Sequence, residues 1–72
     1  MGETDVAMGS VKWFDATKGY GFIIPDDGGK DVFVHIKAVQ KAGYTNLVEG
    51  ARNSYELTRD RSGKMSAWNL RI

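Results

Sequence analysis

The chain has 72 residues, with ten Lys and Arg against nine Asp and Glu, a net charge of +1, and no cysteine. This length is enough for one small domain. Without cysteine the chain has no disulfide and no thiolate metal site, which is typical of a reducing compartment, so we expect a cytoplasmic protein. The near-neutral charge argues against a strongly basic, histone-like binder. We find neither an apolar run of about 18 residues that could span a membrane nor a secretory signal.

In chain order, residues 1–7 are polar and acidic without periodicity, and we predict a disordered tail there and one domain over residues 8–72. The domain shows five short runs of good strand formers, bounded by Gly and Asp turn signals. The predicted strands cover residues 10–15, 20–24, 31–36, 53–58 and 65–72. A short helical turn is predicted within residues 37–42, a long loop at 43–50 and a hairpin loop at 59–63. Five short strands without a long helix predict one sheet that closes into a small barrel.

Alternation in the second and third predicted strands separates rings from aliphatic side chains, because residues two apart share a face of a strand. One face carries the rings Tyr20, Phe22, Phe33 and His35. The other face carries the aliphatic residues Ile23, Val32, Val34 and Ile36. The aliphatic residues make a good core, so we predict that the four rings form one patch on the outer surface. An exposed apolar patch of this size needs something to cover it.

The reverse orientation, with rings inside and aliphatic residues outside, stays open from periodicity alone. Two features argue against it. An imidazole inside so small a core would need a buried partner for His35. In addition, Lys12 and Lys18 flank the aromatic residues in the sequence. Rings interleaved with a few cations are typical of a surface that binds single-stranded nucleic acid, since bases stack on the rings and Lys neutralises the backbone.

The first predicted strand does not alternate cleanly. It contains Val11, Trp13 and Phe14, and the last two are adjacent. Either Trp13 or Phe14 must therefore break the pattern, and we predict a bulge at this point.

Two stretches of the chain resemble motifs of a known family. Residues 18–23, KGYGFI, resemble the first ribonucleoprotein motif, and residues 32–36, VFVHI, resemble the second. The similarity extends to residues 11–14, Ala67, Asn69 and Leu70. Over residues 9–72 the chain therefore resembles a bacterial cold shock protein.

The resemblance implies an all-β, five-stranded antiparallel Greek-key barrel of the oligonucleotide-binding (OB) type, with the ligand face on the first three strands. In the family, this face binds single-stranded RNA and DNA, prefers pyrimidine-rich stretches and melts weak RNA structure. Some members are RNA chaperones and transcription antiterminators. The nucleic-acid-binding positions implied here are Lys12, Trp13, Phe14, Lys18, Tyr20, Phe22, Asp31, Phe33, His35 and Tyr44. We expect a monomer that takes no cofactor, no small-molecule substrate and no membrane as partner.

Three positions depart from the family pattern. Asp15 stands where the family often has Asn, which places a carboxylate beside Trp13 and is expected to weaken the approach of phosphates. Ile36 stands where many members have Phe, so one stacking platform is lost. Trp68 occupies a position that is usually small or polar.

Regular alternation places Trp68 on the same face as Ser66 and Leu70, and Leu70 is the best core residue of the last strand. We therefore predict that Trp68 lies on the core side or caps one end of the barrel. The alternative is an exposed Trp on the last strand. Both readings place Trp68 away from the aromatic patch.

Nothing in the sequence indicates catalysis. His35 is the only histidine, there is no cysteine, and Asp31 lies four residues before His35. A metal role for His35 lacks a second ligand at suitable spacing. The segment Gly28-Gly29-Lys30 lacks the frame of a phosphate-binding loop and is interpreted as a turn. The main alternative is a protein-interaction barrel that docks proline-rich peptides on the aromatic patch.

Overall fold

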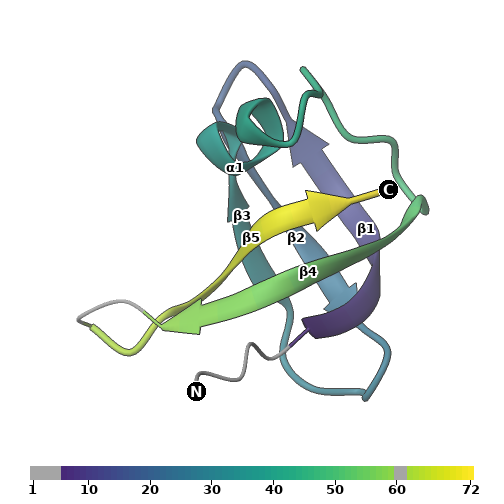
Figure 1. Cartoon of the computed structure of the whole chain (residues 1–72), viewed down its shortest axis with the longest axis vertical. Coiled ribbons are helices and arrows are strands. Elements are labelled where there is room, and N and C mark those ends of the chain that lie inside the picture. Colours follow the sequence, from purple (N-terminus) through teal and green to yellow (C-terminus); the bar gives the residue numbers. More distant parts are fainter. Residues whose placement is uncertain (1–5, 60–61) are drawn as a thin grey trace.

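A computed structural model of the chain describes residues 6–59 and 62–72, and Figure 1 shows their arrangement. The elements in chain order are β1 (Val6–Asp15), β2 (Tyr20–Pro25), β3 (Val32–His35), α1 (Ile36–Lys41), β4 (Arg52–Arg59) and β5 (Met65–Arg71). The strands form a closed barrel in the order β1-β2-β3-β5-β4. The predicted all-β, five-stranded barrel of OB type is confirmed, and α1 is the short helical turn expected after the third strand.

Four of the five neighbouring strand pairs are antiparallel. The pair that closes the barrel, β3 with β5, is parallel, and its register is Phe33 opposite Ser66. Parallel neighbours need a crossover connection, and here the chain supplies it through α1 and β4. The antiparallel arrangement expected from the sequence therefore holds everywhere except at this closing pair.

The first strand is longer than the sequence pattern indicated. β1 starts at Val6, where Val6 pairs with Glu56 and Ala7 with Tyr55 of β4, although both positions fall in the tail predicted over 1–7. Residues 1–5 of that tail lie outside the described residues, as do residues 60 and 61 of the predicted hairpin loop. The early start has a structural reason: the first half of β1 pairs with β4 and the second half with β2. Backbone hydrogen bonds to a strand far along the chain do not require an alternation of polar and apolar residues. The sequence pattern therefore did not reveal the first residues of β1.

The bulge predicted in the first strand is present. The register of β1 against β2 shifts between Val11 and Trp13, which makes Lys12 the extra residue. Val11 is buried in the core, and Trp13 is exposed on the outside of the barrel. Phe14, which follows Trp13 directly, packs against the core. The bulge thus places Trp13 outside, while Val11 before the bulge is buried and Phe14 after Trp13 packs against the core.

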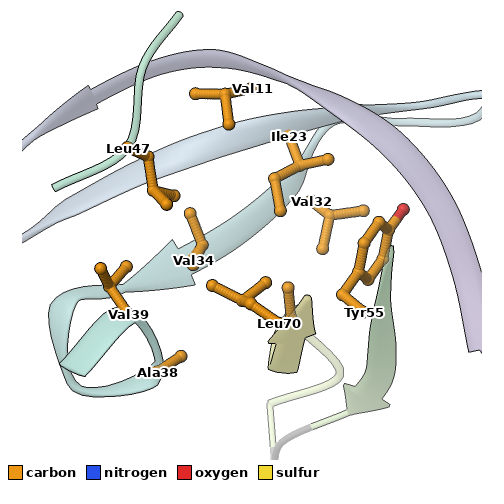
Figure 2. Packing of buried hydrophobic residues seen from close by; sticks show 10 residues of the cluster. Val11, Ile23, Val32, Val34, Ala38, Val39, Leu47, Tyr55 and Leu70 are labelled. Atoms are coloured by element: carbon orange, nitrogen blue, oxygen red, sulfur yellow. The ribbon is translucent and has the colours of Figure 1, made fainter. Parts of the chain in front are cut away.

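The aliphatic face of the strands forms the barrel core, as Figure 2 shows. Ile23 and Val34 are fully buried, and Val32 is 4% exposed. The remaining members of the core are Val11, Ala38, Val39, Leu47, Tyr55, Ala67 and Leu70. The predicted orientation of the strands is therefore confirmed, and the reverse one, with rings inside, is wrong.

The regular alternation predicted for β5 is wrong, although Trp68 packs against the core as predicted. Asn69 adopts a φ of 51°, in the left-handed region that Asn tolerates better than most residues, and this breaks the alternation of β5. As a result Ala67 and Leu70 are both buried, although regular alternation would have placed them on opposite faces. Trp68 lies between them, half-buried, and packs against the edge of the core.

The described part of the core contains a phenolic hydroxyl that the pattern of strand residues did not predict. Tyr55 is 1% exposed, and among the described residues its hydroxyl has no hydrogen-bond partner. Burial raises the pKa of Tyr55 above its usual value of 10.0, and the charges of Asp27 and Asp26 add to this effect. An unpaired buried hydroxyl costs about 1–3 kcal/mol.

We expect Tyr55→Phe to raise the free energy of unfolding by about 1 kcal/mol, because it removes this hydroxyl and keeps the ring. Urea unfolding at neutral pH measures the effect. In the wild type, the raised pKa of Tyr55 contributes to the free energy of unfolding. This contribution is fully present below the pKa of the unfolded state and is lost as pH rises through the higher pKa of the folded state. The stability of Tyr55→Phe should therefore fall less above pH 10.0. A less stable variant would mean that the hydroxyl is well paired in solution.

Candidate nucleic-acid interface

Five rings from the first three strands lie together on the outer surface of the barrel. They are Trp13, Tyr20, Phe22, Phe33 and His35, and we refer to them as the ring cluster. Strand register brings them together: Trp13 lies opposite Phe22, Phe22 opposite Phe33, and Tyr20 opposite His35. The four rings predicted to form one patch are therefore adjacent, and the bulge of β1 adds the indole of Trp13.

The rings of the cluster contact one another in a continuous series. Trp13 contacts Tyr20 and Phe22, with both pairs of centroids 5.5 Å apart and the rings edge to face. Tyr20 and Phe33 stack at 5.7 Å with an angle of 23° between their planes. Phe33 also contacts Phe22 at 5.9 Å and His35 at 6.3 Å. These contacts hold each ring in place, so the surface exists before any ligand arrives.

The backbone beneath the cluster requires a glycine. A Cβ atom at Gly21, between Tyr20 and Phe22, would lie 2.3 Å from the carbonyl oxygen of Trp13 and 2.7 Å from the Cα atom of Phe14. Only glycine allows β1 and β2 to approach this closely. The close approach brings Trp13 against the rings of β2.

The rings remain open to solvent although they contact one another. Trp13 is 36% exposed, and the other four members of the cluster are half-buried. Their buried sides rest on the barrel, and their outer sides supply flat apolar surface. Such a surface stacks well with nucleobases, since every base has a π face.

Three lysines surround the ring cluster. The Nζ atom of Lys12 forms an ion pair of 2.8 Å with Oδ2 of Asp31, so these two predicted site residues hold each other. Lys18 is exposed in the turn between β1 and β2. Lys64, the residue before β5, places its Nζ atom 4.0 Å from the centroid of Phe33, within the range of a cation–π interaction.

Lys64 was not predicted from the sequence. It lies in a hairpin whose position relative to the aromatic strands depends on the parallel pairing of β3 with β5. Its sequence neighbours Gly63 and Met65 give no hint of a ring nearby. The only available signal was a basic residue next to a turn glycine, which is common on protein surfaces.

His35 also shapes the chain that follows the cluster. Its Nδ1 atom accepts a hydrogen bond of 3.1 Å from the backbone N–H of Lys37 and so caps the start of α1. An accepting Nδ1 carries no proton, so the neutral imidazole has its proton on Nε2. The Nε2–H group of His35 is therefore available to donate a hydrogen bond to a ligand.

The carboxylate of Asp15 is engaged in the turn that presents Lys18. Its Oδ1 atom accepts hydrogen bonds from the backbone N–H groups of Thr17, at 2.9 Å, and Lys18, at 3.0 Å. This is the local pattern by which Asp stabilises turns. The side chain that we expected to weaken the approach of phosphates therefore also builds the turn that carries a lysine.

Two predicted site residues lie apart from the ring cluster. Phe14 packs against the barrel core, and Tyr44 lies after α1 and is 37% exposed. Among the described residues, neither makes a ring contact with the cluster. Ile36, at the position where a further stacking ring was considered lost, is half-buried at the start of α1.

The described residues lack two further features that would indicate a different function. Within residues 6–59 and 62–72 there is no group of three or more His, Cys, Asp or Glu side chains that could hold a metal ion. In the same part of the chain, no helix is both long and apolar enough to cross a membrane.

Comparison with known proteins agrees with this geometry. The family model described as "'Cold-shock' DNA-binding domain" matches residues 7–72. The chain belongs to the cold-shock domain family. This confirms the resemblance seen in the sequence, and the family is one of nucleic-acid-binding domains.

The cold-shock domain has similar relatives in several bacteria. A "Probable cold shock protein y4cH" of Sinorhizobium fredii is 65% identical over 66 residues, which is 90% of this chain and 96% of the relative. The cold shock protein CspA of Rhizobium meliloti is 61% identical over 64 residues, covering 88% and 93% of the two chains. The cold shock-like protein CspE of Escherichia coli is 51% identical over 59 residues, covering 82% and 86%.

Proposed function

We propose that this cold-shock domain binds single-stranded RNA and DNA by stacking bases on the ring cluster. The observation that carries the proposal is the position of five contacting rings on the outside of the barrel, over strands whose aliphatic residues fill the core. Burying rings is the usual way for a small domain to gain stability. Placing them outside is favourable when a ligand with flat apolar faces covers them.

In this mechanism, the two parts of a nucleotide meet different groups of the protein. Bases stack on the cluster, while the backbone passes near Lys12, Lys18 and Lys64. The ion pair of Lys12 with Asp31 leaves carboxylate oxygens and ammonium hydrogens next to the rings, where they can bond to the edges of a stacked base. Stacking uses features that RNA and DNA share, so the 2′-OH contributes little.

Further parts of the proposal follow from family membership. We propose a preference for pyrimidine-rich strands and a role as an RNA chaperone that melts weak structure and regulates transcription or translation. Binding of this kind traps unpaired bases and so shifts a weak hairpin towards its open form. A cytoplasmic monomer fits this role, and the lack of cysteine fits a reducing compartment.

A protein-interaction barrel remains the alternative use of the same rings. Proline-rich peptides also dock on aromatic grooves, but they carry no regular charge. The lysines around the ring cluster are better matched to a phosphate backbone. Peptide binding would depend little on salt, which separates the two functions.

We expect a shallow dependence of binding on salt. Two or three phosphates near the lysines of the interface give a slope of log affinity against log salt of about −1.4 to −2, at about −0.7 per phosphate on single strands. Titrations with a short oligothymidine, which covers only the ring cluster, at several salt concentrations measure the slope. A slope steeper than about −5 would show that charge dominates, and a slope of zero would favour a peptide groove.

Competition between single-stranded and duplex DNA tests the proposed function. A thymine-rich strand should displace a labelled oligothymidine, and the same strand annealed to its complement should compete far more weakly, because pairing hides the base faces. An RNA strand of the same sequence should compete about as well as the DNA strand. Equal competition by strand and duplex would overturn the proposal.

A further inference from the structure

A second aromatic residue lies among lysines at the edge of the barrel. Trp68 of β5 and three residues of α1, Lys37, Gln40 and Lys41, line an open hollow of about 530 Å³. Trp68 is half-buried, so part of the indole rests on the core edge and part faces this hollow. The contact with the core edge agrees with the predicted core-side location, and the hollow beside it is a feature that alternation did not predict.

The side chains that line the hollow match those of a single-strand binding surface. Lys37 and Lys41 are four residues apart in α1 and so lie on the same side of the helix. Together with Trp68 they combine one large ring with two cations, and among the described residues no acidic side chain lines the hollow. Across the β4–β5 pair, the residue opposite Trp68 is Glu56, which carries a carboxylate. Its Oε1 atom accepts a hydrogen bond of 2.8 Å from the amide of Asn69.

The hollow begins where the ring cluster ends. Phe33 of the cluster lies opposite Ser66, and since β3 and β5 run parallel, His35 and Trp68 each follow two residues further in the same direction. Helix α1 starts directly after His35, and the backbone N–H of Lys37 donates to His35. Figure 1 shows α1 at the end of β3 with β5 close by, and α1 contacts both strands.

We propose that a single strand bound on the ring cluster continues past His35 into this hollow, where one further base stacks on Trp68 and the backbone passes Lys37 and Lys41. This proposal rests on the proposed function and extends it to residues that neither the sequence motifs nor the ring contacts include. The occupant is the same nucleic acid strand, since the cations and the exposed ring continue the chemistry of the cluster.

A series of oligothymidines tests the extension. Lengths of about 4 to 12 nucleotides fall within the range that one OB fold covers. We expect wild-type affinity to rise once the strand reaches the hollow. Trp68→Leu, which keeps an apolar side chain over the core, should weaken binding of long strands by about 5- to 150-fold, the value of one stacked base. It should leave short strands unaffected. Trp68→Phe, the matched control, should retain most of the effect of length.

Two independent measurements cover the case in which Trp68→Leu fails to fold. The chain has two tryptophans, so in Trp13→Phe the indole fluorescence reports Trp68 alone, and long strands should quench it while short ones do not. The double variant Lys37→Gln, Lys41→Gln changes only surface residues. For long strands, its slope of log affinity against log salt should be shallower than that of the wild type by about 1.4, at about 0.7 per phosphate. For short strands the slope should not change.

The outcomes separate this inference from the proposed function. If short strands bind the wild type, but Trp68 is not quenched and the lysine variant binds long strands with unchanged affinity, only the extension is wrong and Trp68 serves the core alone. If no strand binds the wild type, the ring cluster is not a nucleic-acid interface and both proposals fail.

Discussion

Phe33→Ala should weaken the binding of oligothymidine by about 1–3 kcal/mol while the domain remains folded. Phe33 lies at the centre of the ring cluster, where it contacts Tyr20, Phe22 and His35 and lies beneath Lys64. Removing the ring deletes one stacking platform, which is worth about 1–3 kcal/mol. Since Phe33 is half-buried on the outside of the barrel, the free energy of unfolding should fall by much less than the about 3–5 kcal/mol of a core Phe.

Binding of Phe33→Ala is measured by equilibrium titration and its stability by urea unfolding. Val48→Ala is a suitable control, because Val48 is an apolar side chain that is 72% exposed and outside the cluster. It should change neither quantity. An unfolded Phe33→Ala would show that the rings support the fold, and unchanged affinity would show that the ligand does not use them.

Ile23→Ala should reduce the free energy of unfolding by about 2–5 kcal/mol. Ile23 is 0% exposed and packs at the centre of the aliphatic core, as Figure 2 shows, so truncation leaves a cavity. At about 0.05–0.15 kcal/mol per residue, a domain of this size has a total stability of about 4–11 kcal/mol. The substitution therefore removes a large part of it and lowers the thermal midpoint strongly.

The neighbouring residue provides a matched control for this effect. Ile24 follows Ile23 in the same strand and has the same side chain, but it is 45% exposed. Ile24→Ala should cost well under 1 kcal/mol, as surface substitutions usually do. Thermal and urea unfolding of both variants measure the difference. Equal losses for Ile23→Ala and Ile24→Ala would contradict the assignment of the two faces of β2.

The core and the ring cluster were predictable because β2 and β3 alternate regularly. The period of two assigned Ile23 and Val34 to one face and Phe22 and Phe33 to the other, and the structure has the same arrangement. The uneven spacing of Val11, Trp13 and Phe14 correctly indicated a bulge, since Val11 is buried, Trp13 two residues later is exposed, and Phe14 packs against the core.

The rest of the interface depends on features that a strand pattern does not encode. Lys64 reaches Phe33 only because β5 closes the barrel beside β3, and this long-range pairing leaves no local signal. The alternation of β5 was predicted wrongly because one residue, Asn69, adopts a left-handed conformation, so that Ala67 and Leu70 are both buried. The positions taken from the family include Phe14, which packs against the core, and Tyr44, which lies outside the cluster.

The central claim is that bases on the ring cluster, more than phosphates on the lysines, hold the ligand. Titration of tryptophan fluorescence with an oligothymidine of about seven nucleotides and with an abasic strand of the same length and charge tests it most directly. We predict that the oligothymidine quenches the fluorescence of Trp13 at low concentration, while the abasic strand binds far more weakly at the same salt. Equal affinity for the two strands would show that the backbone alone is recognised and would contradict the stacking mechanism.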